Sequence, residues 1–296
     1  MYSLYIVWYI FLAGMGSGAY AIASLFGFAG RFSGRRHIQE YGRLAEGGFI
    51  LGPILVVIGT VFLLFDLGSP EKAYLALLSP HITVLSVGVW FIVLFSVASG
   101  ALLLNRLRPQ TPFPRIAETA LQVLAFLLSI GVMTYTGVFL ASMQSVPFHH
   151  NWLLVALFVL SSLSTGAATI ALFGFLNQHR KAMLYSLHLI PKIDLALIAA
   201  EVVALGAFLY TAGIGDEVAQ HSLQVLLCGD MAPLFWAGAV GAGLALPLFL
   251  AWLNLRGPQT SLTALGSVLI VVGGFALRYC IIDAGIHVAQ NTLLAG

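Results

Sequence analysis

Residues 131–168 read GVMTYTGVFLASMQSVPFHHNWLLVALFVLSSLSTGAA, and the pattern of this stretch decides the fold. Two apolar segments flank a short break at 143–151, which holds a proline, two histidines and an asparagine but no Lys, Arg, Asp or Glu. A Tyr-Thr-Gly triplet begins at Tyr135 in the first segment, and a run of small residues occupies 164–168 in the second. The pattern predicts two membrane helices joined by a tight, uncharged turn, with polar groups held inside the apolar zone.

The composition of the whole sequence agrees with this interpretation. Hydrophobic residues make up 60% of the sequence, charged residues make up 8%, and the mean hydropathy is +0.98. A soluble domain carries about a quarter charged residues, so this protein cannot build an ordinary hydrated surface. Its apolar runs are long and continuous rather than alternating, which favours helices that satisfy their own backbone in lipid over a membrane barrel. We therefore predict an all-α integral membrane protein.

Eight apolar stretches follow one another, and each is long enough to cross ~30 Å of hydrocarbon. The predicted spans are 3–28, 47–66, 82–104, 116–141, 152–176, 193–213, 231–253 and 261–283. No basic residue precedes the first stretch, and its apolar part is longer than that of a typical cleaved signal peptide. We therefore expect the first stretch to be a membrane span.

Basic residues predict the orientation of these spans. Of the 13 Lys and Arg residues, all but Lys72 and Arg278 lie in the connections that follow the first, third, fifth and seventh spans. The positive-inside rule places these connections in the cytoplasm. Both termini, and the connections 67–81, 142–151 and 214–230, are then expected outside.

A short sequence echo links the two halves of the protein. The stretch SGAYAIA at 17–23 resembles TGAATIA at 165–171, four spans later. Two parallel four-helix bundles, residues 1–145 and 146–296, would explain the echo, with small residues allowing close helix approach. Because small-residue patterns are common in membrane helices, the echo also has an interpretation without duplication.

One set of polar residues is predicted in the outer leaflet. Asp66 ends the second span, and Tyr135 and Arg278 lie at similar depths in the fourth and eighth spans. At about 1.5 Å per residue, the three reach similar levels, and Tyr5 and Tyr9 in the first span join the same layer. Polar groups inside apolar spans are costly, so they are functional candidates.

This outer set has two interpretations. In the structural one, Arg278 pairs with Asp283 or Asp66, and the tyrosines anchor the helices at the interface. In the functional one, an acid, a phenol and a guanidinium surround a pocket for a quinone, and the acid relays protons. Residue chemistry alone leaves both interpretations open.

A second polar set is predicted toward the inside. Asp194 and Glu201 lie seven residues apart in the sixth span, so they face the same side of the helix, and Glu118 begins the fourth span together with Gln122. The acidic groups form either a proton path or ordinary helix–helix hydrogen bonds.

The sequence lacks the signatures of a resident redox group. All eight histidines read as loop or span-end positions, where they cannot form an axial haem pair inside the membrane. There is no Cys motif for an iron–sulfur cluster, no phosphate-binding loop and no metal-ligand run. Cys228 and Cys280 either pack independently or form one bridge. Any redox function therefore requires electrons to pass to or from another subunit.

Short motifs run in order along nearly the whole sequence. They are YIFLAG at 9–14 with Gly18-Ala19, Asp66-Leu67-Gly68 with Pro70, Tyr135-Thr136-Gly137, Pro147-Phe148, LSTGAA at 163–168, Glu201, Gly273-Gly274-Phe275, Leu277-Arg278-Tyr279 and Asp283-Ala284-Gly285. As an ordered set they resemble the NrfD family, the membrane subunit of polysulfide-reductase-type complexes.

The resemblance implies a haem-free membrane subunit that reacts with menaquinone or ubiquinone. Such a subunit exchanges electrons between the quinone pool and a four-cluster, ferredoxin-like iron–sulfur subunit. That partner connects it to a molybdopterin catalytic subunit of the polysulfide, thiosulfate or DMSO reductase type. Iron–sulfur clusters and molybdopterin are expected only in the partner subunits.

The resemblance also assigns candidate residues. By position, Asp66 matches the acid or histidine that lies near the quinone, Tyr135 matches a tyrosine of the fourth helix, and Arg278 and Glu201 match charged positions of the last and sixth spans. We take Asp66, Tyr135 and Arg278 as catalytic candidates, and expect these three with Tyr5, Tyr9 and Gly14 to contact the quinone. Asp194, Glu201 and Glu118, from the inner polar set, are the candidate proton path. Tyr5 and Tyr9 stand where some relatives carry an Asn/His pair, and Ser69 stands where many carry a basic residue, so the head-group contacts differ from the family pattern.

Location and partners follow from the same resemblance. We expect a bacterial or archaeal cytoplasmic membrane, partner subunits on the outer face, contact with lipid and no nucleic-acid partner. The short, uncharged connection at 146–151 suits docking of a partner, although it equally suits simple packing. The alternative functions are an ion-coupled secondary transporter, which also has repeats and charges near the midplane, and a passive anchor.

Overall fold

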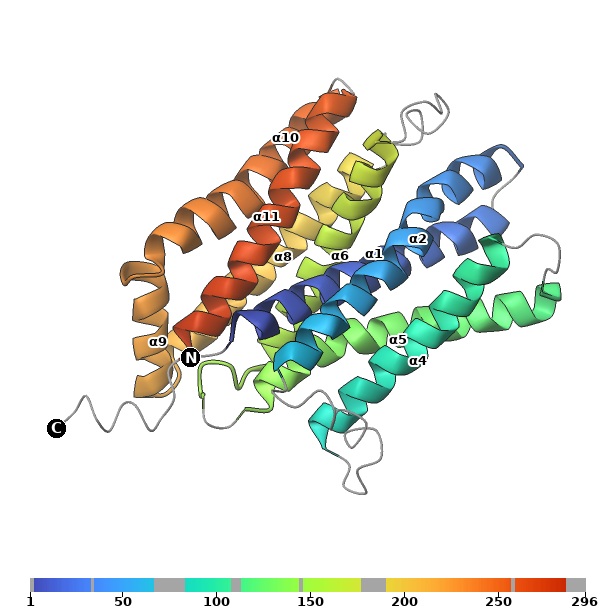
Figure 1. The fold of residues 1–296 in the computed structure, drawn as a ribbon. Helices are drawn as coiled ribbons and strands as arrows, with labels where there is room; N and C mark the ends of the chain where they lie inside the picture. The colour runs from blue at the N-terminus through green and yellow to red at the C-terminus, as the bar shows by residue number, and fades with distance from the viewer. Residues whose placement is uncertain are drawn as a thin grey trace.

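The computed structural model describes residues 3–32, 35–66, 83–107, 113–143, 146–176, 190–256 and 259–285 (Figure 1). All regular secondary structure in these ranges is helical, so the predicted all-α class is confirmed. The elements are α1 (Leu4–Phe32), α2 (Arg35–Asp66), α4 (Val84–Leu107), α5 (Arg115–Ala141), α6 (Trp152–Leu176), α8 (Ile190–Gly213), α9 (Glu217–Cys228), η3 (Leu234–Ala245), α10 (Leu246–Arg256) and α11 (Thr260–Ala284).

Within the described ranges, eight helical stretches are long and apolar enough to cross a membrane, in agreement with the predicted number and order of spans. They are Leu4–Gly30, Ala45–Asp66, Val84–Leu107, Arg115–Ala141, Trp152–Leu176, Pro191–Gly213, Leu234–Arg256 and Thr260–Ala284. Their ends lie close to the predicted ends because apolar length, which sets each span, is a local property of the sequence.

Two helical features were not predicted. The expected outer connection 214–230 contains the short helix α9, which buries Ala219, Ser222 and Leu226 on one side. The seventh span begins as the π-helix η3 and continues as α10. π-Helical segments are rare and often occur at functional sites. Hydropathy does not reveal either feature, because α9 is too short for a span and η3 is apolar throughout.

Helices α1 and α6 form the centre of the molecule. Helix α1 packs against α2, α5, α6 and α11, and α6 packs against α8 and α11 as well. In the most apolar windows of these two spans, 89% and 72% of the residues are buried, whereas most other spans keep a large exposed face. The polar groups carried by α1 and α6 are therefore enclosed by protein rather than by lipid.

The two echo segments found in the sequence contact each other directly. A methyl group on Gly18 would overlap the Ser162 carbonyl, and one on Gly166 would overlap the Ala19 backbone. Glycine is required at both positions because the α1 and α6 backbones touch there. The echo thus has a packing function, while the division into bundles 1–145 and 146–296 stays a prediction.

Figure 1 shows the N-terminus, α9 and the 146–151 segment at one end of the molecule. At the opposite end, basic residues lie in the terminal turns of several helices: Arg106, Arg115, Lys192 and Arg256. This separation is the one on which the predicted orientation depends. The connection 67–81 lies outside the described residues.

Candidate functional site

The side chain of Arg278 is fully buried where α11 meets α6 and α1. Its Nη1 donates hydrogen bonds to Ser161 Oγ at 3.0 Å and to the Gly274 carbonyl at 3.1 Å. Its Nη2 donates to Ser162 Oγ at 2.9 Å and to the Phe158 carbonyl at 3.4 Å. Oxygen atoms of α6 and α11 therefore replace water around the guanidinium, which a buried charge requires.

Aromatic rings and a glycine complete the surroundings of Arg278. The guanidinium carbon lies 5.6 Å from the Phe11 ring centroid and 5.5 Å from that of Phe158, within range of a cation–π interaction. A Cβ atom at Gly14 would lie 2.6 Å from Ser162 Oγ and 3.2 Å from Arg278 Nη2. The predicted site residue Gly14 thus lies beside Arg278, where it leaves room for the guanidinium.

Glu201 of α8 is also buried, and it shares the neighbour Ser161 with Arg278. Its carboxylate is a neighbour of Ser161 and Ser164 and interacts electrostatically with Arg278. The sequence interpretation placed Arg278 and Glu201 in separate outer and inner sets. That separation is corrected here, because a helical side chain points back toward the N-terminus of its helix. The guanidinium consequently reaches Gly274, one turn farther inside.

A narrow crevice lies beside Glu201, between α6, α8, η3 and α11, and it is too tight to admit a water molecule. Its walls include Thr165, Ala239 and the close contact between Gly243 of η3 and Gly273 of α11. Ligand pockets usually measure about 300–1,000 Å³, so this crevice cannot hold a quinone head group. The Glu201 carboxylate therefore meets closely packed protein atoms on this side.

Tyr9 of α1 and Tyr135 of α5 are brought together, as the predicted outer layer required. Both are buried, and their phenol groups interact electrostatically. The Tyr9 hydroxyl has no hydrogen-bond partner of good geometry. The Tyr135 ring lies directly on Gly88 of α4, where any side chain would overlap it. A buried hydroxyl that lacks a hydrogen bond of good geometry is uncommon, so it marks a position where a ligand or water can bind.

Tyr5 lies in the first turn of α1 and Asp66 ends α2, and both helix ends are predicted to face outward. The Ser3 hydroxyl donates a hydrogen bond to the Asp66 carboxylate. Tyr5 is 48% exposed and lies beside the rings of Phe62 and Phe65, with centroids 6.4 and 6.2 Å away. Asp66 therefore lies beside the start of α1, whereas Tyr5 lies at the protein surface and not among the buried phenols.

The predicted inner set is divided between two places. Asp194 is buried on α8, about two turns closer to the N-terminus of that helix than Glu201. The Asp194 Oδ1 atom has no hydrogen-bond partner. Glu118 is half-buried in the first turn of α5, next to the buried Gln122, and α5 makes no substantial contact with α8. Glu118 thus lies apart from Asp194 and Glu201.

The sequence interpretation missed the hydroxyl groups of α6. Ser161, Ser162 and Ser164 surround the charged pair, yet only the small size of the neighbouring residues was noted. The available signal was three serines and a threonine within five residues of a buried, otherwise apolar span. Each hydroxyl can donate to a carbonyl of its own helix, as Ser162 does to Phe158, and still accept a hydrogen bond from another helix, as Ser162 does from Arg278.

No group of three or more His, Cys, Asp or Glu side chains within the described residues could hold a metal ion. Cys228 and Cys280 are both free, the first exposed and the second buried, so the bridge considered from the sequence does not form.

The protein is similar to known proteins over nearly its whole length. The family model described as "Polysulphide reductase, NrfD" matches residues 1–290. The C subunit of polysulfide reductase from Wolinella succinogenes is 28% identical, and the alignment covers 94% of the present sequence and 92% of that protein. Protein NrfD of Escherichia coli is 29% identical, and the NrfD homolog of Haemophilus influenzae is 28% identical, each with the same coverage.

Proposed function

This chain belongs to the NrfD family, and we propose that it is the haem-free, quinone-reactive membrane subunit of a molybdopterin oxidoreductase complex. The observation that carries the proposal is the family match over residues 1–290, in a protein whose core holds buried polar groups on several spans. The match does not favour the alternative of an ion-coupled transporter.

The proposed quinone site lies in the outer layer formed by Asp66, Tyr9 and Tyr135. The buried Tyr9 hydroxyl beside Tyr135, which lacks a hydrogen bond of good geometry, fits a substrate that offers a hydrogen-bonding oxygen in an apolar setting. The Asp66 carboxylate, at the outer end of α2, accepts a proton when quinol is oxidised. Oxidation of one quinol releases two electrons and two protons, and the electrons leave through an iron–sulfur partner.

Arg278 and Glu201 are assigned to proton movement rather than to the quinone head group. The described hydrogen bonds of Arg278 go to α6 and α11, and its electrostatic partner is Glu201. Asp194 and Glu201 lie on one side of α8, so a proton entering from the inner end meets Asp194 first and Glu201 second. Glu118 is left out of this path because it lies on α5.

The partners in this proposal are an iron–sulfur subunit and a molybdopterin catalytic subunit on the outer face. The membrane is the cytoplasmic membrane of a bacterium or archaeon, oriented by the positive-inside rule. One relative is named as a component of polysulfide reductase, which agrees with a subunit of a redox complex. The terminal substrate depends on the catalytic subunit.

The test uses the native complex purified from membranes. Iron and molybdenum content, subunit composition and oxidation of a quinol analogue are measured for the wild type and for Tyr135→Phe and Asp66→Asn. We expect metal-containing partners and a loss of turnover in both variants, while the exposed Tyr210→Phe serves as the control. A protein that purifies alone without metals or quinol reactivity would favour the transporter. Unchanged turnover in Asp66→Asn would favour a passive anchor.

A further inference from the structure

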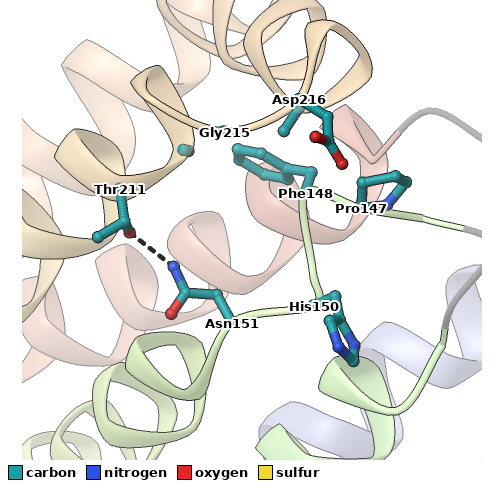
Figure 2. Close-up of a pocket in the computed structure, with 9 residues that line it drawn as sticks. Pro147, Phe148, His150, Asn151, Thr211, Gly215 and Asp216 are labelled. Carbon is teal, nitrogen blue, oxygen red and sulfur yellow. Dashed lines mark hydrogen bonds between the residues drawn. The ribbon is translucent and has the colours of Figure 1, made fainter.

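A second cavity opens at the end of the molecule predicted to face outward. Figure 2 shows it between the 146–151 segment and the connection from α8 to α9. Its volume is about 400 Å³, within the range of cavities that hold a ligand or an inserted side chain. We call it the outer pocket. Its lining residues are Pro147, Phe148, His150, Asn151, Thr211 and Asp216, together with neighbouring small residues.

One wall of the outer pocket is held in place by hydrogen bonds. Asn151 Nδ2 donates to Thr211 Oγ1 at 2.6 Å, a bond drawn in Figure 2 that joins the 146–151 segment to α8. Asn151 Oδ1 accepts a hydrogen bond from the Leu153 amide at 2.9 Å, at the start of α6. The Phe148 ring is buried with its centroid 5.1 Å from that of Phe208. The cavity is therefore preformed rather than dependent on a mobile side chain.

Asp216 contributes a negatively charged carboxylate to the lining of the outer pocket. It occupies the N-cap position of α9, where an Asp side chain normally bonds a backbone amide of the first turn, but it makes no such bond. Figure 2 shows its carboxylate on the side of Pro147 and Phe148, the apolar wall of the cavity. A carboxylate beside an apolar wall is complementary to a side chain with an aliphatic stem and a cationic end.

The surroundings of the outer pocket add to this charge preference. The segments 142–151 and 213–233 contain no Lys or Arg, so no basic side chain of these segments competes for the Asp216 carboxylate. A carboxylate without a basic neighbour on these segments attracts a basic partner and repels an acidic one. An arginine side chain matches both the apolar wall and the Asp216 carboxylate, and arginine is a common anchor of protein interfaces.

We propose that the outer pocket receives an arginine side chain of the extracytoplasmic partner protein, with Asp216 as its charge partner and Pro147 and Phe148 packed against its stem. This inference rests on the proposed function, which supplies a partner on the outer face. The pocket then determines where that partner docks.

The test compares two charge reversals on neighbouring residues. Asp216→Lys places a positive charge in the outer pocket, whereas Glu217→Lys makes the same change of charge at a residue that does not line it. The complex is solubilised in mild detergent, purified through this subunit and washed with increasing salt, and the retained partner is quantified. We expect Asp216→Lys to lower retention by about tenfold or more, and Glu217→Lys to leave it near the wild-type amount.

A second measurement covers the case in which Asp216→Lys fails to fold. A photo-crosslinking amino acid at His150, an exposed residue that also lines the outer pocket, should capture a partner peptide that contains an arginine. Equal retention in both reversals, or a crosslink confined to lipid or to this subunit itself, overturns the docking inference. In that event a wild-type complex that still oxidises quinol leaves the proposed function standing. A wild-type protein that purifies without any partner overturns the proposed function itself.

Discussion

Arg278 in the last span and Glu201 in the sixth interact electrostatically inside the membrane core, with Ser161 adjoining both. Opposite charges at this depth compensate each other, while Ser161 and Ser162 of α6 accept hydrogen bonds from the two Nη atoms of the guanidinium. If either residue is neutralised, the other is left as a buried charge without an opposite charge beside it. We therefore expect the two residues to behave as a unit in stability.

Removing one charge of this unit should destabilise the protein more than removing both. Arg278→Met leaves Glu201 as an uncompensated buried carboxylate, and breaking a buried pair typically costs about 3–5 kcal/mol. The double variant Arg278→Met/Glu201→Gln should recover part of that loss. Thermal unfolding of the detergent-solubilised protein measures both, and additive losses would contradict the coupling.

Gly14→Ala should disturb Arg278 without changing any charge. The added methyl lies 2.6 Å from Ser162 Oγ and 3.2 Å from Arg278 Nη2, so α1 or the guanidinium must move. Overpacking of this kind costs about 1–3 kcal/mol. Gly206→Ala in α8, where nothing lies within 4 Å, is the matched control and should leave the melting temperature unchanged or slightly raised. Equal melting temperatures for the two variants would show that the α1–α6 contact adjusts freely.

Gly88→Ala should impair quinol oxidation by displacing the Tyr135 ring. The methyl would overlap that ring, whereas Gly100→Ala on the same helix has nothing within 4 Å. Because no polar group is removed, a fall in turnover of about tenfold or more in Gly88→Ala alone would assign the effect to ring position. Turnover of the purified complex with a quinol analogue is the measurement. Normal turnover in a folded Gly88→Ala complex would argue against Tyr135 in the quinone site.

Asp194→Asn and Glu201→Gln should abolish proton movement, whereas Glu118→Gln should not. The first two carboxyl groups lie on α8 beside the core, while Glu118 lies on α5. Complexes reconstituted into vesicles with an internal pH-sensitive dye report proton movement during quinol oxidation. A normal pH change in Glu201→Gln would remove this residue from the path. Loss of the pH change in Glu118→Gln would return it to the path.

Much of the architecture was predictable because it depends on local composition. Apolar length gives the eight spans, and basic residues in alternate connections give the expected orientation. The order of the motifs along the sequence was sufficient for the family. The candidate residues Tyr9 and Tyr135 were also found in this way, since a polar side chain in an apolar span is visible without any structure.

The sequence alone therefore determined the all-helical class, the number of spans and the polar residues within them. Tertiary structure decided which of these residues meet: Arg278 with Glu201 and the α6 serines, Tyr9 with Tyr135, and Asp216 with the outer pocket. The physical reason is that lipid is as apolar as the helix core, so hydropathy does not mark the buried face of a span. That face is chosen by backbone contacts at small residues such as Gly18 and Gly166 and by polar pairing between helices distant in sequence.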